Sequence, residues 1–267
     1  MSDADSASSP RNDDPLPLLG LGDPAPVTVH NSSGSAPVLF VCDHACAAVP
    51  ASLNDLGLSP ERLRQHIALD IGAWSLACAL AERFDAPAVG AGFSRLVIDL
   101  NRFPGADGSI PAISDRTQIP GNMAITAQEC AAREREVFVP YHEVVAEQVQ
   151  CLVGRASEPL VVSVHSFTPT MDGVARPWHV GVLSSEDRRV ADPLLQHLRT
   201  RPGLVVGDNK PYSAIAPFGY TTVKHCEEGG LLHALIEIRQ DQVDRPEGIS
   251  RWTGILHDAL SSIPPLR

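Results

Sequence analysis

The chain has 267 residues, of which 43 % are hydrophobic and 20 % are charged, and it carries a formal net charge of −11. Nucleic acids and anionic membrane surfaces bind clustered Lys and Arg, so this acidic composition excludes both as expected partners. A small anionic substrate stays compatible with it, because two or three local arginines are enough to hold one. The length allows a sizeable core, as one large α/β domain or two small ones.

The cysteines and the N-terminal sequence predict a cytoplasmic protein. None of the six cysteines forms a CxxC pair, and we expect reduced thiols. There is no run of 18 apolar residues and no basic segment followed by an apolar core at the start, so neither a membrane span nor a secretory signal is predicted. Cys42 and Cys46 flank His44, but their spacing across a strand end favours packing over metal binding.

Residues 1–36 are rich in Ser, Asp, Pro and Gly, which predicts a disordered or surface-lying segment ahead of a domain over residues 37–267. The domain begins with the apolar run 38–42, which is typical of a buried strand. The run ends at Asp43 and His44, the position where open α/β sheets place their ligand crevice. An ordinary strand-end turn is the alternative interpretation.

A helix is predicted over residues 59–84, with Ser59 as N-cap and Pro60 in the first turn. His66 and Asp70 are four residues apart and would share one face of that helix. Asp70 lies in an otherwise apolar stretch, and a buried carboxylate needs a partner. Asp70 is therefore a candidate functional residue. The alternative interpretation is a structural hydrogen bond of Asp70 with His66 or with the backbone.

Arg95, Asn101 and Arg102 surround the next predicted strand, residues 96–100. A guanidinium group is the usual means of holding a carboxylate with two hydrogen bonds, so these residues are candidates for substrate binding. A long loop over 103–125 follows, and loops of this length are often functional. The helix predicted over 127–154 contains Pro140, which should kink or break it.

A second buried strand, residues 160–164, also ends on a histidine, His165. Two such strands can bring His44 and His165 to the same sheet edge, and two imidazoles with a carboxylate form a common catalytic zinc set. Glu237 lies near the end of the last core strand, 231–238, and is a candidate general base. A Glu237–Arg239 pair is the alternative. Further predicted elements are strands over 178–183 and 204–206 and helices over 187–201, 220–227 and 249–260.

Six sequence blocks carry a resemblance to a known family: VCDHACAAVP, HIALDIGA, SRLVIDLNR, SVHSF, GDNKPYS and IEIRQD. In this order and spacing they resemble the N-formylglutamate amidohydrolase family, in its amidohydrolase-like branch, over about residues 38–245. The resemblance implies one α/β domain of the zinc carboxypeptidase and phosphorylase/hydrolase type, with a mixed, mostly parallel sheet and helices on both faces. It also implies a zinc-dependent enzyme that cleaves the N-formyl amide of formylglutamate. No GxGxxG, P-loop or GxSxG motif points elsewhere.

The resemblance assigns roles to residues by position. His44, His165 and Asp70 would bind the metal, with Asp43 as the alternative third ligand or as a residue that orients His44. The HxxE pair of many carboxypeptidase-like sites is missing, because position 47 is Ala47. Glu237 would be the general base, and Arg176 would help to stabilise the oxyanion and bind the substrate. The remaining substrate contacts would be Arg95, Asn101, Arg102, Tyr212 and Arg239.

Other functions fit the same residues. The substrate could be another N-acyl amino acid or a small peptide, and the metal could be a divalent ion other than zinc. A non-enzymatic alternative is a metal-free module that binds a dicarboxylate through the arginines. The sequence does not define the oligomeric state.

Overall fold

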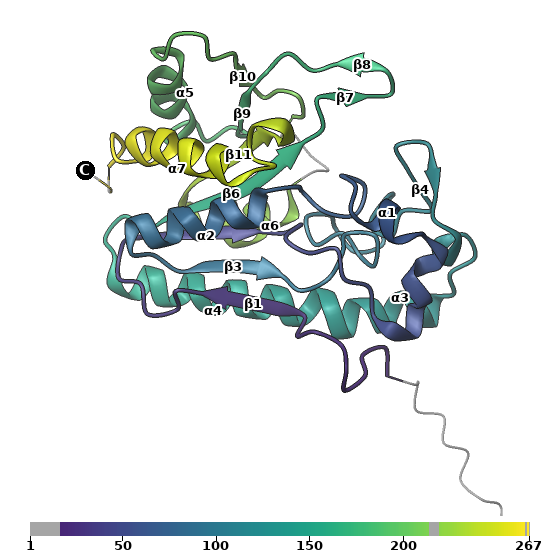
Figure 1. Ribbon diagram of the computed structural model, residues 1–267. Helices are drawn as coiled ribbons and strands as arrows, with labels where there is room; N and C mark the ends of the chain where they lie inside the picture. Colours follow the sequence, from purple (N-terminus) through teal and green to yellow (C-terminus); the bar gives the residue numbers. More distant parts are fainter. Residues whose placement is uncertain (1–16, 214–218, 265, 267) are drawn as a thin grey trace, which may run out of the picture.

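Seven strands form one mixed sheet in the computed structural model, which describes residues 17–213, 219–264 and 266 (Figure 1). Across the sheet the order is β1 (Val27–His30), β3 (Ala88–Ala91), β2 (Val38–Cys42), β6 (Leu160–Phe167), β11 (Leu232–Arg239), β9 (Val180–Leu183) and β10 (Val206–Asp208). Four neighbouring strands, β3, β2, β6 and β11, run parallel, while β1 is antiparallel to β3 and β9 is antiparallel to β11. The predicted mixed, mostly parallel sheet is confirmed.

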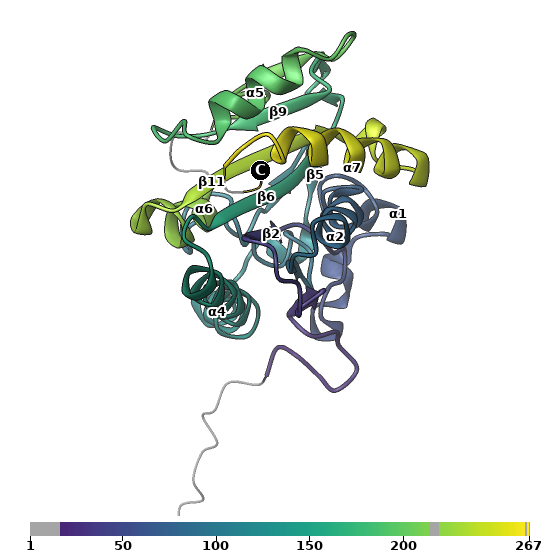
Figure 2. The ribbon, with the colours of Figure 1, turned by 90° about the vertical axis from the view of Figure 1, so that its left-hand side faces the viewer.

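Helices cover both faces of the sheet, as predicted (Figure 2). Val38 and Phe40 of β2 pack into a core with α2 (Ala73–Phe84), α5 (Ala191–Arg199) and α7 (Pro246–Leu260). Leu39 and Val41 point the other way, toward α4 (Val139–Arg155). Successive side chains of a strand alternate between faces, so a strand buried on both sides reads as a continuous apolar run. This is why β2 and β6 are recognisable from sequence.

Shorter elements connect these layers. They are α1 (Pro60–Leu63), α3 (Ala127–Arg133), α6 (Tyr220–His225), the hairpin of β4 (Ile113–Ser114) with β5 (Thr117–Gln118), and the hairpin of β7 (Thr170–Met171) with β8 (Val174–Ala175). Short 3-10 helices lie at Ala51–Gly57, Pro120–Asn122, Glu227–Gly229 and Gln240–Gln242. A π-helix, Glu134–Phe138, joins α3 to α4, so that the expected break falls just before Pro140. Pro140 then lies in the first turn of α4, where a missing N–H costs little.

The predicted helix over 59–84 is wrong, because α1 ends at Leu63 and α2 begins at Ala73. Gly72 has a φ of 78°, and a Cβ there would lie 2.1 Å from the carbonyl oxygen of Val243. Only glycine tolerates both the left-handed backbone and this close approach. His66 and Asp70 therefore do not share a helix face; His66 Nε2 instead lies 3.0 Å from Asp115 Oδ2.

The predicted strand over 96–100 is also wrong. This segment forms turns, with the Val97 amide donating to the Ser94 carbonyl at 2.9 Å and the Arg102 amide donating to the Asp99 carbonyl at 3.2 Å. Side chains replace the missing strand partners: Asn122 donates to the Leu96 carbonyl at 2.8 Å and Arg133 to the Val97 carbonyl at 2.9 Å. An apolar run can therefore be a buried loop, provided that its carbonyls find donors.

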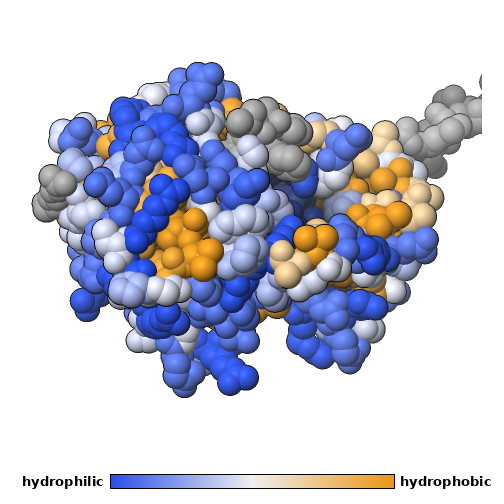
Figure 3. Space-filling model, turned by 90° about the horizontal axis from the view of Figure 1, so that it is seen from above, coloured by the Kyte–Doolittle hydropathy of each residue, from blue (hydrophilic) through white to orange (hydrophobic). Residues whose placement is uncertain are grey.

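The N-terminal segment contributes β1, an edge strand, so residues 27–30 belong to the sheet although they precede the proposed domain start at residue 37. Residues 1–16, where disorder is expected, lie outside the described residues. None of the described helices is long and apolar enough to cross a membrane. The face seen from above is mostly hydrophilic, with apolar patches of limited size (Figure 3).

A hydrogen-bonded histidine pair joins α4 to α6, and its buried member, His142, gives a testable prediction. His142 Nε2 donates to the Leu100 carbonyl at 2.9 Å, so its Nδ1 is the acceptor for His225 Nε2 at 3.0 Å. Burial lowers the pKa of His142 to about 4. The folded state therefore binds fewer protons than the unfolded state between about pH 4 and pH 6.5, and stability falls as the pH falls through this range.

We expect the free energy of unfolding at pH 4.5 to be lower than at pH 7 by about 2 kcal/mol through this group. Urea unfolding of the wild type and of His142→Gln at both pH values measures it. The variant should lose this part of the pH dependence. An identical pH dependence in both proteins would contradict the assignment.

Candidate active site

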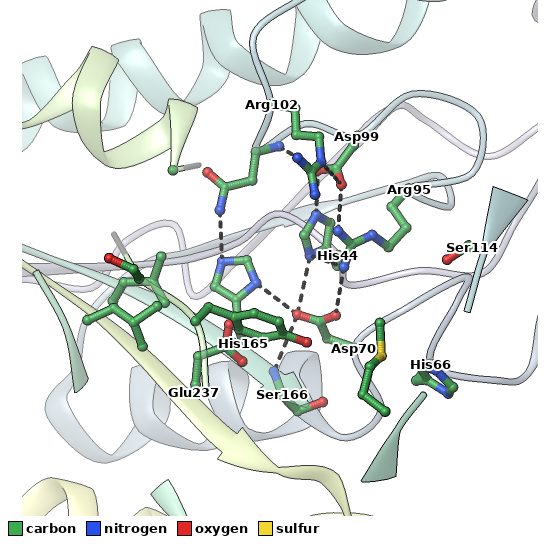
Figure 4. A pocket seen from close by; sticks show the side chains of 17 residues that line it. His44, His66, Asp70, Arg95, Asp99, Arg102, Ser114, His165, Ser166 and Glu237 are labelled. Carbon is green, nitrogen blue, oxygen red and sulfur yellow. Dashed lines mark hydrogen bonds and ion pairs between the residues drawn. The ribbon is translucent and has the colours of Figure 1, made fainter. Parts of the chain in front are cut away.

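The three side chains predicted as metal ligands meet in one buried cluster (Figure 4). His44 Nδ1 lies 3.2 Å and His165 Nδ1 lies 2.8 Å from the same carboxylate oxygen, Asp70 Oδ2. One ligand atom from each residue lies within 4.8 Å of the others. His44 follows β2, His165 lies near the carboxyl end of the adjacent parallel strand β6, and Asp70 precedes α2. The Asp70 amide donates to the His44 carbonyl at 3.0 Å, which fixes the turn beside the histidine.

The second ring nitrogen of each histidine, Nε2, contacts another carboxylate. His44 Nε2 lies 2.7 Å from Asp99 Oδ1, and His165 Nε2 lies 3.3 Å from Asp43 Oδ2 and 3.0 Å from Ser163 Oγ. A metal-bound histidine generally donates its second ring N–H to a carboxylate or carbonyl. With Nε2 engaged in this way, the Nδ1 atoms of both histidines face Asp70 Oδ2, and His44 Nδ1 also lies 3.3 Å from Arg95 Nη1.

Asp43 lies behind His165 and does not orient His44, contrary to the prediction. Its Oδ1 accepts hydrogen bonds from Tyr141 Oη at 2.8 Å and Thr221 Oγ1 at 2.7 Å. Burial favours the neutral acid, but the bond with His165 outweighs it and holds the pKa of Asp43 at about 2. Asp43 Oδ2 also accepts from Ser163 Oγ at 3.5 Å. A fully buried carboxylate contacted by four side chains is placed to orient His165, and Asp70 takes the third position of the cluster.

Asp99 is the residue that the sequence analysis missed. It accepts from Arg95 Nη2 at 2.6 Å and from the Asn101 amide at 3.0 Å, besides its contact with His44. Burial opposes its ionisation, but Arg95 and His44 keep its pKa below the ordinary value. Asp99 lies inside an apolar run of the sequence, and this pattern could have marked it as a candidate, as the same pattern did for Asp70.

The electrostatics of the cluster favour positive charge. Burial alone lowers the pKa of His165, but Asp43 and Asp70 raise it well above the ordinary value. Burial and Arg95 likewise lower the pKa of His44, and Asp99 and Asp70 outweigh them. Buried carboxylates that draw protons onto two imidazoles also favour a cation in place of those protons.

Glu237 faces the cluster from the neighbouring strand. It pairs in register with His165 across β11 and β6, and it is buried. Among the described residues no hydrogen-bond partner reaches its Oε2 atom, although that atom is shielded from solvent. Burial raises the pKa of Glu237 to about 7. The alternative pair with Arg239 is not formed, because Arg239 binds Asp241, with Nε 2.8 Å from Oδ1.

The cluster lies in a pocket of about 290 Å³. Four predicted substrate-binding residues line it: Arg95, Asn101, Arg102 and Tyr212. Arg176 and Arg239 do not line it, contrary to the prediction. Arg176 Nη1 donates to Tyr212 Oη at 2.9 Å, and its guanidinium lies 4.8 Å from the centre of the Tyr212 ring. Arg176 therefore contacts a residue that lines the pocket, Tyr212, without lining it itself.

A mixed, mostly parallel sheet with a buried His/Asp/His cluster and a buried glutamate toward the carboxyl ends of its strands is an arrangement suited to a metal-dependent hydrolase. The family model for N-formylglutamate amidohydrolase matches residues 36–243, which is most of the chain. The chain therefore belongs to the N-formylglutamate amidohydrolase family, as predicted, and this membership supports an amidohydrolase activity.

Two solved structures are similar to this chain. The crystal structure of gene product Atu2144 from Agrobacterium tumefaciens shares 34 % identity, with a TM-score of 0.88, over 92 % of this chain and 97 % of that chain. The crystal structure of N-formylglutamate amidohydrolase from Ralstonia eutropha JMP134 shares 21 % identity, with a TM-score of 0.61, over 88 % of this chain and 96 % of that chain. This second likeness shows a common fold. A search of curated proteins found no match.

Proposed function

We propose that the chain is a cytoplasmic, metal-dependent amidohydrolase that cleaves the N-formyl or N-acyl amide of an acidic amino acid such as N-formylglutamate. The observation that carries the proposal is the cluster of His44, Asp70 and His165 with Glu237 in the same pocket. Two imidazoles and one carboxylate suit zinc better than magnesium, because magnesium prefers ligands that are all oxygen atoms. The Nδ1 atoms that face Asp70 and the Oε2 of Glu237, which no hydrogen-bond partner reaches within the described part of the chain, fit such a group.

Zinc bound by these three residues would lower the pKa of water and polarise the amide carbonyl. Glu237, which lies beside His165 on the neighbouring strand, would take a proton from the attacking water and pass it to the leaving nitrogen. Water adds to the carbonyl carbon, the C–N bond breaks, and the products are a carboxylic acid and a free amine. Arg95 and Arg102, at the pocket wall, would bind the carboxylates of the amino acid.

The proposal is tested with protein freed of metal by a chelator and then supplied with zinc or with other divalent ions. Release of free amine is followed over a panel of N-formyl and N-acyl amino acids and small peptides. Amine release from N-formylglutamate or another N-acyl acidic amino acid, restored by metal, supports the proposal. Release only from other substrates would favour the broader hydrolase. Failure to bind any divalent ion, together with dicarboxylate binding, would favour the metal-free module.

Asp43 gives a prediction on how His165 is held. Replacing Asp43 with Asn removes the negative charge behind His165 and should weaken zinc binding about 10- to 100-fold, the usual effect of losing such a partner. Competition with a chromophoric chelator measures the Kd. Tyr141→Phe is the matched control, because it removes one hydrogen bond to Asp43 and leaves the charge. Equal zinc affinity in D43N and Y141F would contradict the role.

A further inference from the structure

The pocket has a cationic end, where Arg95 and Arg102 both contact Asp99, and an apolar end, with the cluster between them. The order of strands in the sheet sets this arrangement. Arg95 and Arg102 follow β3, His44 follows β2, His165 lies on β6, Glu237 on β11 and Leu183 on β9. These five strands are consecutive neighbours in the sheet. Figure 4 shows the same order, with Glu237 on one side of His44, Asp70 and His165 and the two arginines on the other.

Leu183 and Leu235 form the apolar end. Leu235 precedes Glu237 by two residues on β11 and so lies on the same face of the sheet. It pairs directly with Leu183 across β11 and β9. Both side chains line the pocket, and both are buried. Since neighbouring strands are about 4.8 Å apart, β9 lies about 10 Å from the strand of His165.

The covalent structure of an N-acyl amino acid decides which part of the substrate meets the leucines. The carboxylate and the amino-acid side chain branch from one carbon on the nitrogen side of the amide. The acyl substituent lies on the opposite side of that bond. If the carboxylate binds Arg95 and Arg102 and the amide lies at the cluster, the acyl substituent points toward β11 and β9. In a formyl group this substituent is a hydrogen atom, which leaves the apolar end unused.

We infer that Leu183 and Leu235 form an acyl-binding subsite, and that the substrates are acidic amino acids with a short aliphatic acyl group on the nitrogen. The inference rests on the proposed function and narrows its substrate class. Each methylene moved from water onto this apolar surface should raise kcat/KM about four-fold, if the transition state buries it fully.

The test compares N-acetyl-, N-propionyl- and N-butyryl-L-glutamate with the zinc-loaded full-length protein. Their carbonyl groups are almost equally reactive, so the series isolates binding of the chain, whereas N-formylglutamate is intrinsically more reactive and is measured separately. We expect kcat/KM to rise about 16-fold from acetyl to butyryl, the product of two methylene steps. The variant Leu183→Phe fills the subsite and should bring the butyryl-to-acetyl ratio close to one. Leu183→Met conserves the volume and should keep the ratio high.

The outcomes separate the inference from the proposed function. Thermal unfolding of each variant first confirms that it is folded. Hydrolysis of N-formylglutamate with a kcat/KM that falls from acetyl to butyryl would overturn the inference and leave the proposed function standing. A ratio that stays unchanged in L183F would also overturn it. Failure of the metal-loaded protein to hydrolyse any of the four compounds would overturn both.

Discussion

Replacing Glu237 with Gln is expected to lower kcat by about 10²- to 10⁴-fold, the usual contribution of a positioned general acid–base group, with little change in KM. Glutamine has almost the same size and fills the same space on β11, but it cannot accept a proton from water. Steady-state kinetics with the best substrate of the panel measure the effect. Glu247→Gln, at an exposed position in the first turn of α7, is the matched control and should keep full activity.

The pH profile gives a second readout of Glu237. Burial raises its pKa to about 7, and a bound divalent cation would lower this pKa again. The base must be ionised to act, so kcat/KM should rise with pH along a limb centred at or below pH 7. E237Q should lose that limb. Normal turnover in E237Q, or an unchanged acid limb, would contradict the assignment.

Replacing Asp70 with Asn is expected to abolish metal retention. Asn is isosteric but neutral, and it removes the only carboxylate oxygen that lies between His44 Nδ1 and His165 Nδ1 among the described residues. Zinc affinity should fall by more than about 100-fold, because even second-layer partners contribute up to that factor. Activity should fall in parallel at limiting zinc.

The metal content of D70N is measured by mass spectrometry after dialysis against zinc-containing buffer. Asp115→Asn is the matched control: Asp115 is bonded to His66 outside the cluster, and its φ of 39° is one that Asn tolerates. D115N should retain the wild-type zinc content. Equal zinc content in D70N and the wild type, with both folded, would show that Asp70 is not a ligand.

The parts of the site that lie on strands were predictable from the sequence. The apolar runs that end at His44 and His165 correspond to β2 and β6, which are buried on both faces and adjacent in the sheet. Polar residues at the carboxyl ends of parallel strands converge, so the pairing of the two histidines and the approach of Glu237 followed from the pattern.

The parts of the site that lie on turns were not predictable in the same way. Asp70 was expected on a helix face beside His66, but it reaches the cluster from a turn that Gly72 makes possible. Asp99 was overlooked because an apolar run over 96–100 is typical of a strand, whereas the carbonyls of this segment are bonded by Asn122 and Arg133. Those donors are distant in sequence, and local patterns carry no information about them.

The predicted arginines show the same limit. Charge marks a residue as a candidate for carboxylate binding, but only the fold decides where its side chain points. Arg95 and Arg102 line the pocket, while Arg176 lies against Tyr212 and Arg239 binds Asp241. A nearby acidic residue does not decide this, because Arg95 and Arg102 also contact an acid close in sequence, Asp99, and still line the pocket.

Anomalous diffraction at the zinc absorption edge, from crystals of the zinc-loaded protein, tests the central claim most directly. The cluster of His44, Asp70 and His165 predicts a single strong peak whose nearest protein atoms are Nδ1 of the two histidines and a carboxylate oxygen of Asp70. The distances should be about 2.0–2.2 Å, as for zinc bound to nitrogen and oxygen. A peak held by other residues, or a zinc-loaded crystal with no peak at this cluster, would contradict the account.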